Sequence, residues 1–214
     1  MNYYIADLHL GHSNVIGFDN RPFADVDEMN EAIVRNWNSA VTKQDTVYVL
    51  GDFIWAKESL WSAWLERLNG CKVLIRGNHD PKEFSQQTKR YFQDITAYKE
   101  ITDTGRHIIM CHYPVPFHRA DYDEKCYMLY GHVHATREYD ILTRLRQEII
   151  ASHTEHHHAR GQFINVGCMM PWMDYTPRTL NEILTHESLQ NSHSMSFETQ
   201  IATVICVFNN INKD

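Results

Sequence analysis

Short apolar runs recur along the chain, and each one ends in a polar cluster that contains Gly, Asp, Asn or His. Runs of this length that are rich in β-branched and aromatic residues are typical of buried strands. The pattern predicts six strands, whose apolar runs are 3–6, 46–50, 71–75, 107–111, 127–130 and 162–166.

Apolar residues at helical spacing fill several of the intervals between these runs. Met29, Ile33 and Trp37 share one face of a predicted helix, and Asp25 or Asp27 can cap its N-terminus. The same spacing predicts further helices at 60–68, 84–92, 142–150 and 180–189, and a last apolar run predicts a strand at 201–208.

Strands that alternate with helices indicate a layered α/β fold, in which helices cover a sheet. The chain has 214 residues, 43% of them hydrophobic, which is enough for one sizeable core. We therefore expect a single domain over residues 1–214. In a sheet of this kind, ligands gather at the carboxyl ends of the strands.

The charge balance narrows the class of partner. Lys and Arg total 20 against 27 Asp and Glu, which gives a net charge of -7. Such a balance offers no broad cationic surface for long duplex nucleic acid, so a small or short substrate is favoured. Divalent cations bound in a pocket would reverse the potential there, whatever the charge outside.

The five cysteines are odd in number and form no C-x-x-C pair. They indicate neither a disulfide framework nor a zinc knuckle, and we expect reduced thiols. No apolar run approaches the roughly 18 residues of a membrane span, and the first residues do not resemble a secretory signal. The sequence therefore predicts a cytoplasmic protein that is not bound to a membrane.

Seven side chains that can bind metal lie at or just beyond the ends of the predicted strands. They are Asp7, His9, Asp52, Asn78, His112, His132 and His134. Carboxylates, neutral imidazoles and an amide oxygen form a mixed donor set that suits Mn, Fe, Zn or Co. Two such ions about 3.5–4 Å apart can acidify water, neutralise phosphoryl oxygens and align the attacking and leaving oxygens. The donor set therefore predicts a two-metal site for phosphate esters.

Five motifs in a fixed order carry a resemblance to a known family. They are D-x-H at 7–9, G-D at 51–52, G-N-H-D at 77–80, His112, and G-H-x-H at 131–134. In this order, each after a predicted strand, they resemble the calcineurin-like metallophosphoesterase superfamily. The resemblance implies an α/β fold of four layers, an αββα sandwich with a mixed β-sheet core.

The resemblance also implies a role for each candidate ligand. One divalent ion would be bound by Asp7, His9 and His134, the other by Asn78, His112 and His132, with Asp52 bridging the two. The ions would be Mn, Fe or Zn, and a hydroxide that bridges them would attack phosphorus directly. His79 would bind no metal but would act in catalysis with Asp52. It would stabilise the phosphoryl group and protonate the leaving oxygen, oriented by Asp80 or another carboxylate.

The loop after the first motif resembles that of small bacterial single-domain phosphoesterases within the superfamily. The likeness rests on residues 11–16, 21–23 and 37–38. His12, Asn14 and Arg21 would lie over the site and contact substrate. Arg21 could bind a phosphoryl oxygen through the fork-shaped donor of its guanidinium. The alternative for Asn14 is loop hydrogen bonding or helix capping, and for Arg21 it is a surface ion pair.

Other segments exclude related functions. Phe53-Ile54-Trp55 follows Gly51-Asp52 in place of the G-D-x-x-D-R-G run of the Ser/Thr protein phosphatases, so protein phosphatase activity is not expected. The chain also lacks the capping and DNA-binding segments of the large double-strand-break nucleases. The run 156–158 of three histidines is interpreted as a solvated loop in preference to a metal-binding tract.

Together these features predict a metal-dependent hydrolase of phosphate esters. Its substrate would be a monoester or diester of a small metabolite, a nucleotide or a short oligonucleotide. A nuclease that processes single-stranded ends is one alternative, and the acidic charge balance argues against it. A non-catalytic scaffold for protein partners is another, and the intact set of candidate site residues argues against that reading.

Overall fold

The computed structural model of the chain describes residues 1–152, 154 and 159–186. The chain divides into two units, Met1–Leu180 and Asn181–Asp214. Of the second unit, residues 181–186 are described, and they are helical. The predicted strand at 201–208, the histidine run and the end of the helix predicted at 180–189 lie outside the described residues. A single domain over 1–214 stays a prediction.

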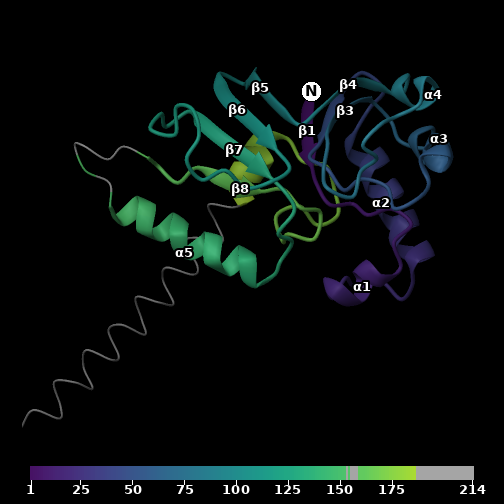
Figure 1. Cartoon of the computed structure of the whole chain (residues 1–214), viewed down its shortest axis with the longest axis horizontal. Coiled ribbons are helices and arrows are strands. Elements are labelled where there is room, and N and C mark those ends of the chain that lie inside the picture. The colour runs from purple at the N-terminus through teal and green to yellow at the C-terminus, as the bar shows by residue number, and fades with distance from the viewer. Residues whose placement is uncertain (153, 155–158, 187–214) are drawn as a thin grey trace, which may run out of the picture. The chain divides into compact units, whose positions relative to one another are not determined.

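Four parallel strands form the first sheet, in the order β1-β2-β3-β4 (Figure 1). Their bounds are β1 Asn2–Ile5, β2 Thr46–Val49, β3 Cys71–Ile75 and β4 Phe92–Thr96. Buried side chains line up across the sheet, since Tyr4 pairs with Tyr48 and Tyr48 with Val73. Because each neighbouring pair is parallel, all four carboxyl ends lie at one edge.

The second sheet is mixed and has the order β5-β6-β7-β8. Its strands are β5 Tyr98–Asp103, β6 Arg106–Cys111, β7 Cys126–Tyr130 and β8 Phe163–Asn165. The pair β5 and β6 is antiparallel, whereas β6, β7 and β8 are parallel to one another. The carboxyl ends of these three parallel strands therefore share one edge.

The segments that follow β1 and β8 join the two sheets. Ala6 forms a parallel bridge with Gly167. Its N–H donates to Val166 O at 2.8 Å, and its own carbonyl accepts the N–H of Cys168 at 2.8 Å. This bridge places Asp7, the next residue along the chain, where strand ends from both sheets can contribute side chains.

Helices lie outside both sheets, with α2, α3 and α4 beside the first and α5 beside the second (Figure 1). Their bounds are α1 Asn14–Phe18, α2 Val26–Ala40, the 3-10 helix η1 Glu58–Leu60, α3 Trp61–Leu65, α4 Gln86–Lys89 and α5 Arg137–Ala151. The Asp25 side chain caps α2 by accepting the N–H of Glu28 at 2.8 Å. Two sheets flanked by helices confirm the predicted α/β fold.

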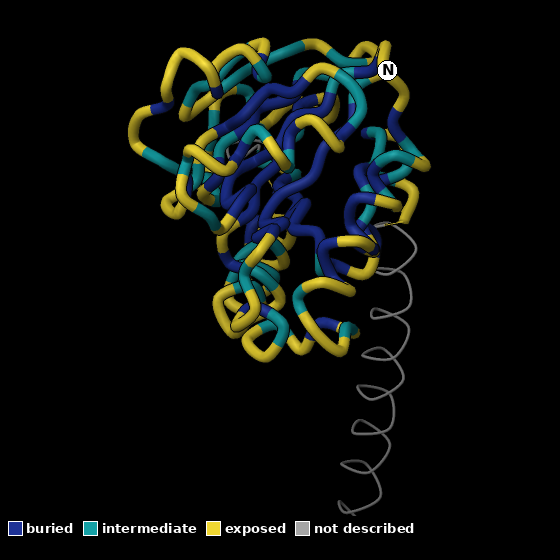
Figure 2. Tube along the Cα trace, turned by 90° about the vertical axis from the view of Figure 1, so that its right-hand side faces the viewer, coloured by how far each residue is buried: buried dark blue, intermediate teal, exposed yellow. Residues whose placement is uncertain are grey.

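The buried segments are concentrated in the strands, and exposed ones in the loops and outer helix faces (Figure 2). On the second sheet, Met128 and Phe163 pack against Leu142 and Ile149 of α5. In the part of the chain that the structure describes, no helix is both long and apolar enough to cross a membrane.

One predicted helix is wrong over most of its length. The apolar spacing predicts a helix over 84–92, but the structure has α4 over Gln86–Lys89 and begins β4 at Phe92. Phe84 and Phe92 are both buried because they surround Trp61, at ring-centroid distances of 5.1 and 6.4 Å. The spacing therefore reflects an aromatic cluster and not a helix face.

Two other helices differ in extent. The helix predicted at 60–68 is a short pair, η1 followed by α3, whereas the one predicted at 142–150 begins earlier, at Arg137. The strands β4 and β5 are absent from the sequence-based prediction.

Candidate active site

Loops at the carboxyl ends of five strands meet where the two sheets join. They carry the seven candidate ligands: Asp7 and His9 after β1, Asp52 after β2, Asn78 after β3, His112 after β6, and His132 and His134 after β7. The strands that hold them belong to both sheets, so neither sheet alone could assemble the cluster.

Five of the seven candidate ligands have a left-handed backbone. The φ angle is 57° at Asp7, 51° at His9, 51° at Asp52, 73° at His132 and 47° at His134. Positive φ is uncommon outside glycine, although Asp and His adopt it more often than most residues, and such conformations cluster at functional sites. Each bends its loop sharply just after a strand, which lets neighbouring loops approach one another.

Glycines make room for these carboxylates. A Cβ atom on Gly77 would lie 2.3 Å from Asp52 Oδ1, and one on Gly131 would lie 2.6 Å from Asp7 Oδ2. Both separations are far inside van der Waals contact, so the backbone of these turns can approach the carboxylates only without a side chain.

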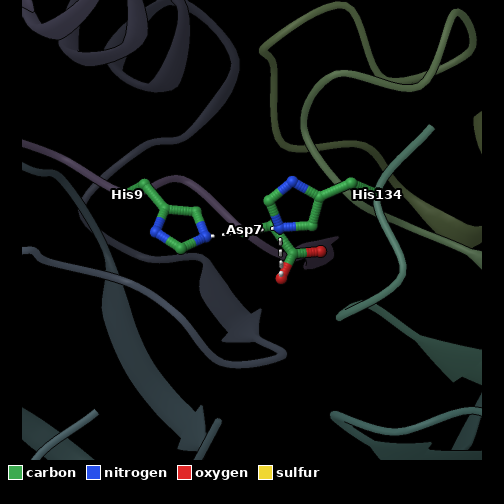
Figure 3. Close-up of side chains that lie close together, drawn as sticks. All are labelled: Asp7, His9 and His134. Atoms are coloured by element: carbon green, nitrogen blue, oxygen red, sulfur yellow. Dashed lines mark hydrogen bonds and ion pairs between the residues drawn. The ribbon is translucent and has the colours of Figure 1, made fainter. Parts of the chain in front are cut away.

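Asp7, His9 and His134 form the first compact group of donor atoms (Figure 3). Asp7 is fully buried, and His9 is 4% exposed. His9 Nε2 lies 3.3 Å from His134 Nε2, which lies 3.9 Å from Asp7 Oδ1. A carboxylate and two imidazole nitrogens this close together fit a divalent cation.

Asp7, Asp52 and His112 form the second compact group. His112 Nδ1 donates to Leu50 O at 2.8 Å, which leaves Nε2 of the neutral ring as an acceptor. That Nε2 lies 3.0 Å from Asn78 Oδ1 and 3.7 Å from Asp52 Oδ2. When the ring is neutral, Nε2 has no hydrogen to share with the two oxygens that it faces, and a cation among the three fits this arrangement.

Asp52, a member of the second group, is also close to the first. Its Oδ2 is 3.7 Å from His9 Nε2 on one side and 3.7 Å from His112 Nε2 on the other. Its Oδ1 accepts the backbone N–H of His79 at 2.9 Å. Asp7 belongs to both groups. The family resemblance of the sequence implies Asp52 alone as the carboxylate that the two ions share.

His132 lies beside the second group with its side chain exposed. Its backbone N–H donates to both oxygens of Asp7, at 3.1 and 3.0 Å. Its ring lies 5.1 Å from the His112 ring and 4.7 Å from the Tyr113 ring, between centroids. His132 is therefore near the cluster through its ring and part of it through its backbone.

His79 stands over the cluster. Its side chain is 46% exposed, and Nε2 lies 4.0 Å from Asp52 Oδ2. Asp80 does not orient this ring. Its carboxylate instead accepts the backbone N–H groups of Asp52, Phe53 and Gly77 at 3.0, 3.0 and 2.8 Å, which ties the loops after β2 and β3 together.

The sequence predicts that Arg21 contacts substrate, but the structure places its guanidinium elsewhere. The residue is 4% exposed, and Nη2 and Nη1 donate to the carbonyl oxygens of Asp7 and Leu8 at 2.8 and 3.0 Å. Its Nε donates to Asp19 Oδ2 at 2.9 Å. The guanidinium is thus turned inward, where it holds the β1 loop. The alternative prediction for Arg21 is a surface ion pair. The structure has an ion pair between Arg21 and Asp19, but it is buried.

The other two loop residues lie closer to solvent. Asn14 is exposed and is the first residue of α1. His12 is partly buried, and its ring stacks on Trp55. Neither side chain belongs to the two compact donor groups.

Two residues that support the cluster were missed at the level of sequence. Asp19 Oδ1 accepts a hydrogen bond from His134 Nδ1 at 2.7 Å, with the Asp19 side chain 2% exposed. Asn165, at the end of β8, donates from Nδ2 to His134 O at 3.2 Å. Neither lies in a motif, and only the packing of distant segments reveals them.

Burial perturbs the titration of the first group. Burial raises the pKa of Asp7 to about 6, against neighbouring histidines that favour its ionised form. Burial, with His134 and Arg21 nearby, lowers the pKa of His9 to about 2, so its ring is neutral at pH 7. A neutral imidazole beside a carboxylate that ionises below pH 7 suits metal binding.

Comparison with known proteins identifies the family of the chain. Residues 3–187 match the calcineurin-like phosphoesterase superfamily domain. An uncharacterized protein of Methanocaldococcus jannaschii is 36% identical over 154 residues, which cover 70% of this chain and 80% of that protein. The gene 66 protein of Mycobacterium phage L5 is 27% identical over 160 residues, which cover 62% of this chain and 77% of the phage protein.

A solved structure supports the fold. The crystal structure of a protein of unknown function from Aquifex aeolicus matches with a TM-score of 0.61 and 28% identity, covering 86% of this chain and 98% of that one. The family match spans nearly the whole chain and includes every motif described above. The chain therefore belongs to the calcineurin-like phosphoesterase superfamily and is a metal-dependent hydrolase of phosphate esters.

Proposed function

We propose that this hydrolase uses two divalent ions that share Asp52, and that it cleaves esters of small phosphorylated molecules. The observation that carries the proposal is the position of the Asp52 carboxylate. Its Oδ2 is equally distant, at 3.7 Å, from Nε2 of His9 and of His112, which belong to different donor groups. A carboxylate placed in this way can serve two cations at once.

The residues divide between the two ions by proximity. Asp7, His9 and His134 would hold one, and His112, Asn78 and His132 would hold the other, with Mn, Fe or Zn favoured by the donors. When bound, the ions supply Lewis acidity that activates water and neutralises phosphoryl oxygens. Asp7 can contribute to both sites because it belongs to both groups.

His79 is proposed to move the proton that the leaving group needs. Its ring is half exposed, so it can contact a substrate, and Nε2 lies 4.0 Å from Asp52 Oδ2. The backbone bond from His79 N to Asp52 Oδ1 holds the residue against the cluster. A proton held at Nε2 can pass to the ester oxygen as the bond to phosphorus breaks.

The proposed substrate is a small metabolite, a nucleotide or a short oligonucleotide. The net charge of -7 supports this choice over long duplex nucleic acid. The proposal covers both monoesters and diesters.

An activity screen tests the proposal. The enzyme is stripped of metal, reloaded with Mn, Zn or Mg, and assayed on phosphorylated metabolites, cyclic nucleotides and short single-stranded oligonucleotides. Asp52→Asn is the test variant. Asp94→Asn is the matched control, because Asp94 is a half-exposed carboxylate paired with Lys99 on the surface.

We expect hydrolysis that requires added metal, that Asp94→Asn retains, and that Asp52→Asn loses. A protein that retains metal but cleaves no ester in the panel would contradict the proposal and favour a scaffold. Equal activity in Asp52→Asn would contradict the shared carboxylate.

A further inference from the structure

Trp55 lies at the rim of the candidate active site. It follows Asp52 by three residues, and its backbone N–H donates to Leu10 O at 2.8 Å, which ties its loop to the one that carries His9. The centroid of its ring lies 5.0 Å from that of His79 and 6.1 Å from that of His9. Trp55 is nevertheless 43% exposed.

His12 supports the indole from one side. The two rings are stacked with centroids 4.0 Å apart and an interplanar angle of 10°. Because His12 is stacked on one face of the indole, the exposed area of Trp55 lies elsewhere on the ring. His12 Nδ1 is buried and has no hydrogen-bond partner among the described residues.

Other tryptophans in the described chain have packing partners that account for them. Trp37 and Trp61 are fully buried, and Trp172 is 6% exposed. Trp64 lies against the Arg67 guanidinium, 5.5 Å from the ring centroid. Trp55 instead presents apolar ring area to solvent next to a polar cluster, and burying that area against a ligand is favourable.

We propose that Trp55, backed by His12, stacks against an aromatic ring on the leaving alcohol of the substrate. The inference rests on the proposed function. It names the substrate class as phosphate esters of nucleosides or of aromatic alcohols.

The position of His79 decides which part of the substrate meets the indole. His79 is close to both residues, since its ring centroid lies 5.0 Å from that of the indole and its Nε2 lies 4.0 Å from Asp52 Oδ2. A leaving oxygen that takes the proton of His79 is therefore near Trp55. A ring carried by that alcohol can contact the exposed part of the indole.

Paired substrates that differ only in the ring test this inference. Adenosine 5′-monophosphate and ribose 5-phosphate share a primary alcohol as leaving group, and so do benzyl phosphate and cyclohexylmethyl phosphate. The measurement is the ratio of kcat/KM within each pair, in the Mn-loaded enzyme. The variants are Trp55→Leu and Trp55→Phe, and Trp64→Leu is the control for loss of a surface tryptophan.

We expect the wild-type enzyme to prefer the member with the aromatic ring. Trp55→Leu should lower the ratio by about 5- to 150-fold, the range that stacking of a base on an aromatic side chain provides, and Trp55→Phe should restore part of it. Trp64→Leu should leave the ratio as in the wild type. A change in the nucleotide pair alone identifies a nucleobase as the ring, and a change in both pairs identifies any aromatic ring.

An enzyme that cleaves both members of each pair with ratios that Trp55→Leu does not alter would overturn the stacking inference and leave the proposed function standing. A wild-type enzyme that cleaves no phosphate ester with metal present would overturn both.

Discussion

Two histidines of the donor groups are held in defined orientations by their far nitrogens. His112 donates from Nδ1 to Leu50 O, and His134 donates from Nδ1 to Asp19, so Nε2 of each ring faces the cluster and can bind a metal when it carries no proton. Although burial alone would lower the pKa of His134, the bond to Asp19 and the nearby Asp7 raise it above its ordinary value. Metal binding at His134 therefore competes with protonation of the ring.

Removal of Asp19 should weaken metal binding without touching a candidate ligand. Asp19→Ala frees the His134 ring, and loss of such a partner typically lowers metal affinity by about 10- to 100-fold. Titration calorimetry with Mn checks the change, and Asp19→Asn, which can still accept the hydrogen bond, should lose less. Asp94→Ala is the surface control. An Asp19→Ala variant with unchanged affinity would contradict this role.

His79→Gln should separate proton transfer from metal binding. Gln keeps a polar side chain of similar reach but cannot supply the proton, so kcat should fall by about 10²- to 10⁴-fold, the usual contribution of general acid catalysis. Bound Mn, measured by mass spectrometry, should stay at the wild-type level. Loss of metal together with activity would instead place His79 among the ligands.

The raised pKa of Asp7 predicts how the free energy of unfolding of the metal-free protein depends on pH. Its folded pKa of about 6 exceeds its ordinary value of 3.8, so the folded state binds this proton more tightly than the unfolded state. This tighter proton binding adds fully to the free energy of unfolding below about pH 4. The contribution is lost as the pH rises through 6, and the loss amounts to about 3 kcal/mol. In chelator, the free energy of unfolding of the wild type should fall by that amount relative to Asp7→Asn between about pH 3 and pH 7. A difference that does not vary with pH would contradict the raised pKa.

At the scale of elements, the loops after the strands are more constrained than the strands themselves. Gly131→Ala would place a Cβ atom 2.6 Å from Asp7 Oδ2 and 2.7 Å from Ala6 Cβ. We expect a destabilisation of about 1–3 kcal/mol, as in other overpacked cores, and weaker metal binding. Gly17→Ala in α1 meets no atom within 4 Å and should be neutral or stabilising by about 0.4–1 kcal/mol. Thermal unfolding of the two variants makes the comparison, and equal melting temperatures would contradict it.

Elements with one-sided apolar patterns could be predicted from sequence, and others could not. The apolar face of α2 and the apolar runs of β1, β2, β3, β6, β7 and β8 are local signals. The strands β4 and β5 carry mostly half-exposed polar residues, such as Thr96 and Lys99, so they resemble loops in sequence. The pairing of β4 with β3 joins segments that are separate in sequence, which a short window does not contain, whereas β5 pairs with β6 across the short turn at Thr104 and Gly105.

At the scale of the whole molecule, the site depends on how the two sheets meet. The bridge between Ala6 and Gly167 joins the sheets immediately before Asp7. The motifs indicate which residues lie at strand ends, and this part of the site could be predicted. The inward turn of Arg21, the support from Asp19 and the exposed indole of Trp55 depend on contacts between loops far apart in sequence, which spacing does not encode.

The number of metal ions needed for activity tests the central claim most directly. Metal-free enzyme is titrated with Mn, and bound metal per chain is measured alongside hydrolysis of a phosphate ester. We predict that activity reaches its maximum at two ions per chain in the wild type, and that Asp52→Asn binds fewer and does not hydrolyse the ester. Full activity with a single ion, or activity that survives chelation, would contradict a site built on two ions that share Asp52.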